Sequence, residues 1–363
     1  MFNRLLAGGR VLMLVWALVL GACGLPGSAG TATPGASSNA EPTAAEQPTT
    51  GSAATQAPGG EMRNITVAMP YIPNVQFAYM YVADKAGYYA QEGLTITFDY
   101  NFETDVVQRV AQGTVQFGMA SADSVLLARS QGLPVLTVAT TSQRFPTVLY
   151  SKAEQNITTP ADLRGKTVGI PGRFGASYIG LLALLYANKI PESDLNIQEI
   201  GFAQVPALIE DKVQVASGYG NNEPIQLEQQ GVKVNVISVA DSYPLASDGI
   251  IASEKLLADD PELVRAFVRA TMHGMQDVID NPQAAFDTSL TYIPEAQLGD
   301  SALQSKVLDA TIPYWQSDLT KQHGLGYSNP EAWQATATFL HDAGILKADV
   351  DVAKSYTNDL IAK

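Results

Sequence analysis

The sequence predicts an α/β protein built from two lobes, with a mostly helical C-terminal part. From residue 63 onward, short apolar strand patterns alternate with helical patterns, and the alternation starts again after Pro160. Alternation of this kind is typical of largely parallel sheets covered by helices. After residue 252 the patterns are mostly helical. A folded region of about 300 residues is too long for one small domain and suits two lobes.

The N-terminus has the pattern of a secretory signal with a lipid attachment site. Arg4 and Arg10 accompany an apolar run at residues 11–20 (VLMLVWALVL), which is too short to span a bilayer as a helix and suits a signal peptide. The run leads through Gly21-Ala22 into Cys23, the only cysteine of the chain, and resembles a bacterial lipobox. We expect a signal peptide at 1–22 and lipidation of Cys23. An ordinary signal peptide with an incidental cysteine is the alternative.

Residues 23–61 are expected to form a flexible tether between the lipidated cysteine and the folded region. Residues 24–60 are rich in Gly, Ala, Pro, Ser and Thr, and Glu41 and Glu46 are their only charged residues. Such a segment buries too little apolar area to offset its ordering entropy. The whole chain has 22 basic and 36 acidic residues and a net charge of −14, which disfavours binding to nucleic acid.

In the first part of the folded region, each strand pattern leads into a helix with recognisable ends. Residues 65–69 (ITVAM) predict a strand and residues 70–74 a turn, and Asn74 is placed to cap a helix at 75–86 that ends at Gly87. The later strands are predicted at 95–100, 115–120 and 135–140. One later helix is predicted at 105–112, and a second begins at the capping residues 121–124 and ends at Gly132.

The second part repeats the pattern and then becomes helical. Residues 167–170 predict a strand, residues 171–175 a glycine-containing turn, and residues 176–188 a helix. The remaining predicted elements are strands at 197–200, 213–217, 234–239 and 249–252, and helices at 222–230, 261–280, 282–291, 301–314 and 330–342. Asp260-Pro261 and Asn329-Pro330 each place a capping residue before a proline at the first helical position.

The lobe boundaries follow from where the two patterns meet. We expect the chain to cross to the second lobe near residues 147–151 and to return near 245–249. The first lobe is then 62–148 with 248–363, and the second lobe is 149–247. Ligands of open α/β sheets bind beyond the carboxyl ends of the strands, so the turns after the strands are the places to look for a site.

Several stretches between residues 65 and 293 resemble a known family. The chain is similar to the solute-binding proteins that serve thiamine-pyrimidine, sulfonate and riboflavin importers of the ABC type. The stretches that carry the resemblance are Pro73-Asn74, 81–89 (YVADKAGYY), 92–94 (EGL), 117–123 (FGMASAD), 128–135 (ARSQGLPV), 162–169 (DLRGKTVG), Glu223-Pro224 and the helix at 264–274. The resemblance implies a periplasmic-binding-protein fold with a ligand cleft between its lobes.

The resemblance also implies a function and a set of partners. The chain is expected to work outside the cytoplasm as a monomer that captures a flat heteroaromatic solute and delivers it to a membrane permease driven by a separate ATPase. Thiamine-pyrimidine binders of this family carry a tryptophan before Thr-Pro-Asn in their first turn, whereas this chain has Tyr71 to Asn74 (YIPN). Residues 72–78 (IPNVQFA) are more similar to the riboflavin-binding branch. Riboflavin is therefore the first candidate ligand, a thiamine-type pyrimidine the second and a sulfonate the third.

Candidate ligand contacts in the first lobe follow predicted strands. Tyr71 is placed to stack on a flat ring, and Asn74 is either a ligand contact or only a helix cap. Phe77 belongs to an aromatic stripe that is otherwise typical of a core. The remaining candidates lie after the third strand and near the crossover, where they are alternatively helix caps or core residues: Ser121, Asp123, Ser124 and Phe145.

Candidate contacts in the second lobe gather at two helix starts. The first helix start is a standard place for an anion or a polar group, and its candidates are Arg173, Phe174, Ser177 and Tyr178. Asn222 and Glu223 begin the next predicted helix, where the family tends to place an acidic ligand contact. Asp248, beside the return strand, is an additional candidate.

The sequence disfavours catalysis. Eukaryotic relatives of this fold that make the thiamine pyrimidine sacrifice a histidine and need a cysteine-rich loop. Here the three histidines, His273, His323 and His341, all fall in the C-terminal helical part, and Cys23 is the only cysteine. The sequence shows no metal-ligand spacing and no phosphate-binding loop. We therefore expect a binding protein without catalytic residues, metal or cofactor; a pyrimidine-synthase-like enzyme is the alternative from a different class.

Overall fold

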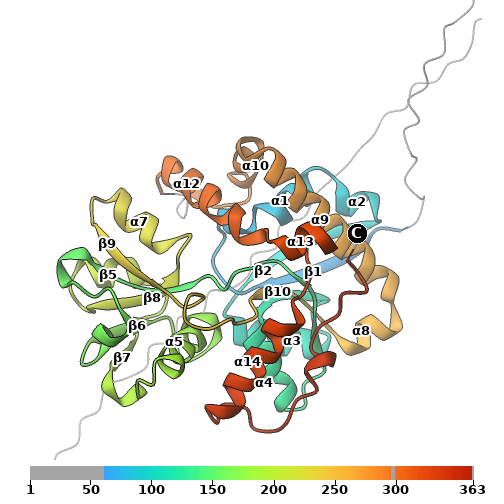
Figure 1. Ribbon diagram of the computed structural model, residues 1–363. Coiled ribbons are helices and arrows are strands. Elements are labelled where there is room, and N and C mark those ends of the chain that lie inside the picture. Colours follow the sequence, from blue (N-terminus) through green and yellow to red (C-terminus); the bar gives the residue numbers. More distant parts are fainter. Residues whose placement is uncertain (1–60, 296–298, 362–363) are drawn as a thin grey trace, which may run out of the picture. The chain divides into compact units, whose positions relative to one another are not determined.

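The computed structural model describes residues 61–295 and 299–361 (Figure 1). The predicted signal peptide, Cys23 and residues 24–60 of the predicted tether lie outside the described residues. Within the described residues, none of the helices has the length and apolarity that crossing a membrane requires.

Two five-stranded sheets form the framework of the fold. The first sheet has the order β2-β1-β3-β10-β4 and the second the order β7-β6-β8-β5-β9. The strands of the first sheet are β1 (Arg63–Met69), β2 (Leu94–Tyr100), β3 (Phe117–Ser121), β4 (Val135–Thr140) and β10 (Asp248–Ser253). Those of the second sheet are β5 (Thr147–Lys152), β6 (Thr167–Ile170), β7 (Asn196–Glu199), β8 (Val215–Tyr219) and β9 (Val234–Ser238).

Each sheet contains one strand that runs against its neighbours. In the first sheet β1 pairs in parallel with β2 and β3, whereas β10 is antiparallel to β3 and β4. In the second sheet β6 pairs in parallel with β7 and β8, whereas β5 is antiparallel to β8 and β9. The two antiparallel strands are those that the chain enters directly after passing from one sheet to the other.

Helices cover both faces of the first sheet. On one face α1 packs against α9 and α10, and on the other α3 and α4 pack against the strands and α14 against α4 (Figure 1). The helices near the first sheet are α1 (Ala78–Lys85), α2 (Tyr88–Gln91), α3 (Glu103–Gln112), α4 (Ala122–Ser130), α8 (Glu254–Asp259), α9 (Pro261–Asp280), α10 (Pro282–Ser289), α12 (Ser301–Thr311), α13 (Asp318–His323) and α14 (Pro330–Asp342). Those of the second sheet are α5 (Gly175–Ala187), α6 (Gln204–Ile209) and α7 (Glu223–Gln229).

The first sheet has an apolar core on each of its two faces. Because side chains alternate along a strand, successive residues pack into opposite cores. In β1, Ile65, Val67 and Met69 lie in the core beneath α1 and α9, whereas Ala68 lies in the core on the opposite face. This is the period of two that a pleated strand imposes. The second core continues from α3 and α4 through Phe145 to the second sheet, so apolar packing runs through the junction of the two lobes.

The predicted fold class is confirmed, but several predicted elements differ from the structure. Residues 147–151, which the sequence suggests as a connection between lobes, belong to β5, which lies between β8 and β9 in the second sheet. The helix predicted at 75–86 begins as a short 3-10 helix, Val75–Phe77, before α1. The helix predicted at 301–314 ends at Thr311, because Pro313 lacks the backbone N–H that the next turn requires. Helices α2, α6, α8 and α13 have no counterpart in the prediction.

Candidate ligand-binding pocket

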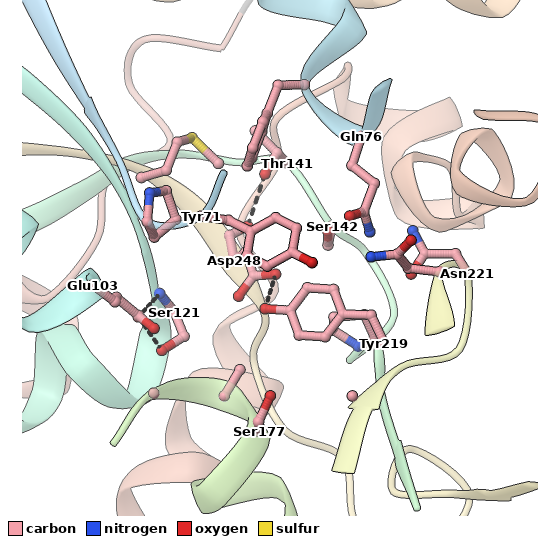
Figure 2. Close-up of a pocket in the computed structure, with 18 of the residues that line it drawn as sticks. Tyr71, Gln76, Glu103, Ser121, Thr141, Ser142, Ser177, Tyr219, Asn221 and Asp248 are labelled. Atoms are coloured by element: carbon pink, nitrogen blue, oxygen red, sulfur yellow. Dashed lines mark hydrogen bonds between the residues drawn. The ribbon is translucent and has the colours of Figure 1, made fainter. Parts of the chain in front are cut away.

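A pocket lies where the carboxyl ends of strands from both sheets meet. Its walls include the turn after β1, the end of β3, the end of β8 and the first turns of α3 and α5. About 1000 Å³ of unfilled space lies between these walls when the open mouth is included. Ten of the lining residues are labelled in Figure 2: Tyr71, Gln76, Glu103, Ser121, Thr141, Ser142, Ser177, Tyr219, Asn221 and Asp248.

The charged side chains in the pocket wall are all acidic. They are Glu103 and Asp248, from the elements of the first sheet, and Glu223, from the start of α7. Among the described residues, no lysine, arginine or histidine lines the pocket. A buried negative charge without a counter-ion is costly, so each carboxyl group must be satisfied by hydrogen bonds or keep its proton.

Glu103 is held by hydrogen bonds within the first lobe. Its Oε1 atom accepts one bond from the backbone N–H of Ser121 and one from the Ser121 hydroxyl, both at 2.6 Å (Figure 2). The other oxygen faces Gly175 in the second lobe, where an added Cβ would overlap the carboxylate. Gly175 has φ of 62°, a conformation that favours glycine. The close approach of the two lobes at this point therefore depends on a residue without a side chain.

Asp248 lies at the start of β10 in the floor of the pocket. The Tyr219 hydroxyl donates to its Oδ2 atom at 3.0 Å. Burial and, to a smaller extent, the negative charge of Glu103 raise the pKa of Asp248 to about 7, against the lowering effect of the bond from Tyr219. Asp248 thus keeps its proton several pH units above an exposed aspartate.

Glu223 lies on the opposite lobe, at the first position of α7. Its Oε2 atom accepts a bond from the backbone N–H of Tyr219 at 2.8 Å, and only 6% of the residue is exposed. Burial raises the pKa of Glu223 to about 7, against the lowering effect of bonds from two backbone N–H groups. The side chain is therefore a hydrogen-bond donor below that pH and an acceptor above it.

Tyr71 reaches across the pocket from the first lobe to the second. Its ring meets Phe202 edge to face, with 4.8 Å between the ring centroids. Phe202 in turn stacks on Phe102 at 5.3 Å, and Phe102 meets Phe174 at 5.6 Å. Burial and the charge of Glu223 raise the pKa of Tyr71, so the phenol stays neutral. Four aromatic rings from both lobes thus adjoin the pocket.

The structure brings most of the expected contact residues to this pocket. Those that line it are Tyr71, Phe77, Ser121, Phe174, Ser177, Asn222, Glu223 and Asp248. Asp123 and Ser124 lie behind the wall, next to Ser121. The Ser121 hydroxyl contacts the Ser124 hydroxyl at 3.1 Å, and both carboxyl oxygens of Asp123 are buried without a hydrogen-bond partner. Burial and the charge of Glu103 raise the pKa of Asp123 well above its usual range.

Besides Asp123 and Ser124, four more expected residues do not line the pocket. Asn74 acts as a cap, because its side chain accepts from the backbone N–H of Gln76. Phe145 is only 2% exposed and belongs to the core between the lobes. Arg173 pairs with Glu192 and lies over the ring of Tyr178. Arg173 and Tyr178 line a different hollow of the surface.

Sequence reasoning missed several residues of the wall. Glu103, Phe202 and Tyr219 follow or end strands of the sheets, so the rule about carboxyl ends of strands, applied to every strand, would have found them. Thr311 and Trp315 come from the C-terminal helical part. No local pattern marks these two, because long-range packing alone brings them to the pocket.

Known proteins resemble this chain along most of its length. A family model described as NMT1/THI5 like matches residues 74–285. The riboflavin-binding protein RibY of Chloroflexus aurantiacus is 50% identical over 347 residues, which cover 95% of each chain. The formylaminopyrimidine-binding protein of Halalkalibacterium halodurans is 27% identical over 289 residues, which cover 77% of this chain and 86% of the relative.

Solved structures share the fold at low sequence identity. The alkanesulfonate-binding protein SsuA from Xanthomonas axonopodis pv. citri, bound to MOPS, superposes with a TM-score of 0.65 at 15% identity, over 82% of this chain and 99% of that chain. A Candida albicans protein described as having the generic periplasmic binding protein fold superposes with a TM-score of 0.59 at 15% identity, over 83% and 98% of the two chains. The predicted periplasmic-binding-protein fold is thereby confirmed.

Proposed function

We propose, from the premise that the chain belongs to the NMT1/THI5-like family, that it captures riboflavin outside the cytoplasm and delivers it to an ABC importer. The relative that is 50% identical is a binding protein, whereas a pyrimidine phosphate synthase of Legionella pneumophila is only 25% identical, so a solute-binding protein is supported over an enzyme. The observation that carries the choice of riboflavin is the 50% identity to RibY over 95% of both chains.

The chemistry of the pocket supports a flat, uncharged ligand. The isoalloxazine ring of riboflavin offers two faces for contact with aromatic side chains and a polar edge for hydrogen bonds. Tyr71 and Phe174 supply aromatic surface in the wall. Asn221 donates to the Thr311 hydroxyl at 2.8 Å, while its Oδ1 atom is buried without a partner among the described residues. A ring N–H of the ligand is a suitable donor for that oxygen.

A pyrimidine is the second candidate ligand. The formylaminopyrimidine-binding protein is a relative over 77% of this chain, and a protonated Glu223 suits a ring nitrogen as well as it suits a flavin carbonyl. A sulfonate ranks third, because no positively charged side chain among the described residues lines the pocket. Sulfonates carry a full negative charge, which needs compensation once it is buried.

The importer and the membrane anchor complete the proposal. A lipid on Cys23 and a tether to residue 61 would hold the binding domain as a monomer above the membrane, where a permease and its ATPase receive the solute. The arrangement is supported by the signal-like apolar run and by the composition of residues 24–60. The two lobes would close on the solute by bending at the segments that join the sheets.

A fluorescence titration tests the choice of ligand. The mature chain, purified in detergent, is added to dilute riboflavin while the flavin emission is followed. We expect saturable quenching at one flavin per chain, because stacking on aromatic side chains quenches the flavin. Unchanged emission, together with no heat of binding in calorimetry, would exclude riboflavin, and the pyrimidine would then be titrated by calorimetry.

A further inference from the structure

The first turn of α5 faces the pocket without a cap of its own. The residue before the helix, Phe174, makes no capping hydrogen bond with its side chain. Gly175, Ala176 and Ser177 of the first turn all line the pocket. The free N–H groups and the positive end of a helix dipole make such a turn favourable for an anion. An anionic solute in this pocket would therefore be expected to bind there.

Glu103 of the opposite lobe brings a carboxylate to this helix start. Its Oε1 atom is fixed by two hydrogen bonds of 2.6 Å from Ser121. Its Oε2 atom lies so close to Gly175 that a Cβ at that position would overlap it. The carboxylate thus lies beside the start of α5 without accepting a backbone hydrogen bond from it, and Ser121, which is 1% exposed, limits its movement.

The other acidic groups around Glu103 offer an anion no compensating charge. Asp248 and Glu223 line the same pocket, and Asp123 lies buried behind Ser121 with its carboxyl oxygens unpaired. No described lining residue carries a positive charge. An anionic group that entered would lose its hydration and meet the charge of Glu103 at a low effective dielectric constant, and above about pH 7 it would also meet the charges of Asp248 and Glu223. A neutral or positively charged ligand does not meet this repulsion.

We propose that Glu103 is a specificity residue: by placing the protein's own carboxylate beside the N-terminus of α5, it excludes anionic solutes, including the phosphate ester of riboflavin. The choice of flavins as probes rests on the proposed function, whereas the exclusion of anions rests on the geometry of Glu103, Ser121 and Gly175.

Riboflavin and riboflavin 5′-phosphate are a matched pair of probes, because they share one chromophore and differ by one phosphate. Both are titrated by fluorescence into the mature wild-type chain, into Glu103→Gln and into the control Glu262→Gln. Glu262 also lies in the first turn of a helix, α9, but its side chain is 81% exposed. Melting temperatures show whether each variant folds, and Glu103→Ala replaces Glu103→Gln if the latter does not.

We expect wild type to bind riboflavin at least about 100-fold more tightly than its phosphate, because like charges in a binding site cost several kcal/mol. Glu103→Gln should narrow this ratio at least about tenfold, mainly by tighter binding of the phosphate. Glu262→Gln should leave the ratio unchanged. Equal affinity of wild type for both flavins, or an unchanged ratio in Glu103→Gln, would overturn the assignment.

Calorimetry with MOPS separates this inference from the proposed function, because it needs no flavin. We expect weak or no binding to wild type and at least about tenfold tighter binding to Glu103→Gln. If wild type does not bind riboflavin but Glu103→Gln gains affinity for MOPS, the riboflavin proposal is refuted and the role of Glu103 is supported. If Glu103→Gln gains affinity for neither anion, the role of Glu103 is refuted.

Discussion

Replacing Asp248 with asparagine should change how the stability of the protein depends on pH. Asp248 is partly buried in the pocket floor, and its pKa is raised from 3.8 to about 7. Asparagine has nearly the same shape and stays neutral at every pH. Its side-chain oxygen can still accept the hydrogen bond that the Tyr219 hydroxyl donates to Asp248. The two proteins therefore differ mainly in one titrating group.

The direction of the effect follows from proton binding. The unfolded chain loses the Asp248 proton near pH 4, whereas the folded chain keeps it until about pH 7. Between these values the folded state binds more protons, so the free energy of unfolding of wild type falls as the pH rises. A shift of about three pKa units corresponds to about 4 kcal/mol, which is the upper limit of the effect.

The groups that surround Asp248 are common to both proteins. Tyr219 donates to its carboxyl group, Thr141 and Ser142 donate to its backbone carbonyl, and the charge of Glu103 faces it from α3. Burial also raises the pKa of Glu223 to about 7, which lowers the stability of both proteins over the same pH window. The difference between the two proteins therefore isolates the contribution of Asp248.

Urea unfolding at a series of pH values between about 4 and 8, the window set by the two pKa values, measures this difference. Tryptophan emission reports the transition, since Trp315 lies in the pocket wall. We expect Asp248→Asn to gain stability relative to wild type as the pH rises, by up to about 4 kcal/mol at pH 8. If the two stability curves stay parallel over this range, Asp248 does not titrate as its burial requires, and the reasoning fails.

Three further predictions concern binding, packing and anchoring. Tyr71→Ala should weaken riboflavin binding by about 1–3 kcal/mol in the fluorescence titration, through loss of aromatic contact; unchanged affinity would remove Tyr71 from the site. Gly274→Ala should destabilise the fold in urea by about 1–3 kcal/mol, because a Cβ there would overlap the Tyr79 carbonyl oxygen and Ala83 of α1; equal or greater stability would show that helix propensity outweighs the overlap. Cys23→Ser should move the chain from the membrane fraction to the soluble fraction, and retention in the membrane fraction would exclude a lipid anchor on this residue.

The sequence indicates the first sheet more completely than the second. Strand patterns such as 65–69 and 135–140 correspond to β1 and β4, because strands buried on both faces read as short apolar runs. Residues 147–152 contain the same kind of run, TVLYSK. No turn signal in the local sequence shows whether this run is a strand or a connection between the lobes. Pairing with β8 and β9, which are distant in sequence, decides that it is a strand.

The local sequence predicts a ligand contact correctly where a suitable side chain also lies at the end of a strand or the start of a helix. Tyr71, Ser177 and Glu223 each follow a strand or begin a helix, and each lies in the pocket wall. Arg173 satisfies the same rule, yet it turns away to pair with Glu192, because a cation on the surface is better hydrated than a buried one. Such a choice depends on neighbours that the local sequence does not show.

The position of β10 has a consequence for how the chain matures during export. In the first sheet β4 is joined to β3 only through β10, and β10 is not available until residue 253 has emerged. The first sheet is therefore incomplete while the first 247 residues are threaded through a translocation channel, even though four of its strands have already passed. At that stage β2, β1 and β3 can pair with one another, whereas β4 has no partner in the sheet. The first sheet can therefore be completed only after the whole second sheet and the return strand β10 have reached the far side.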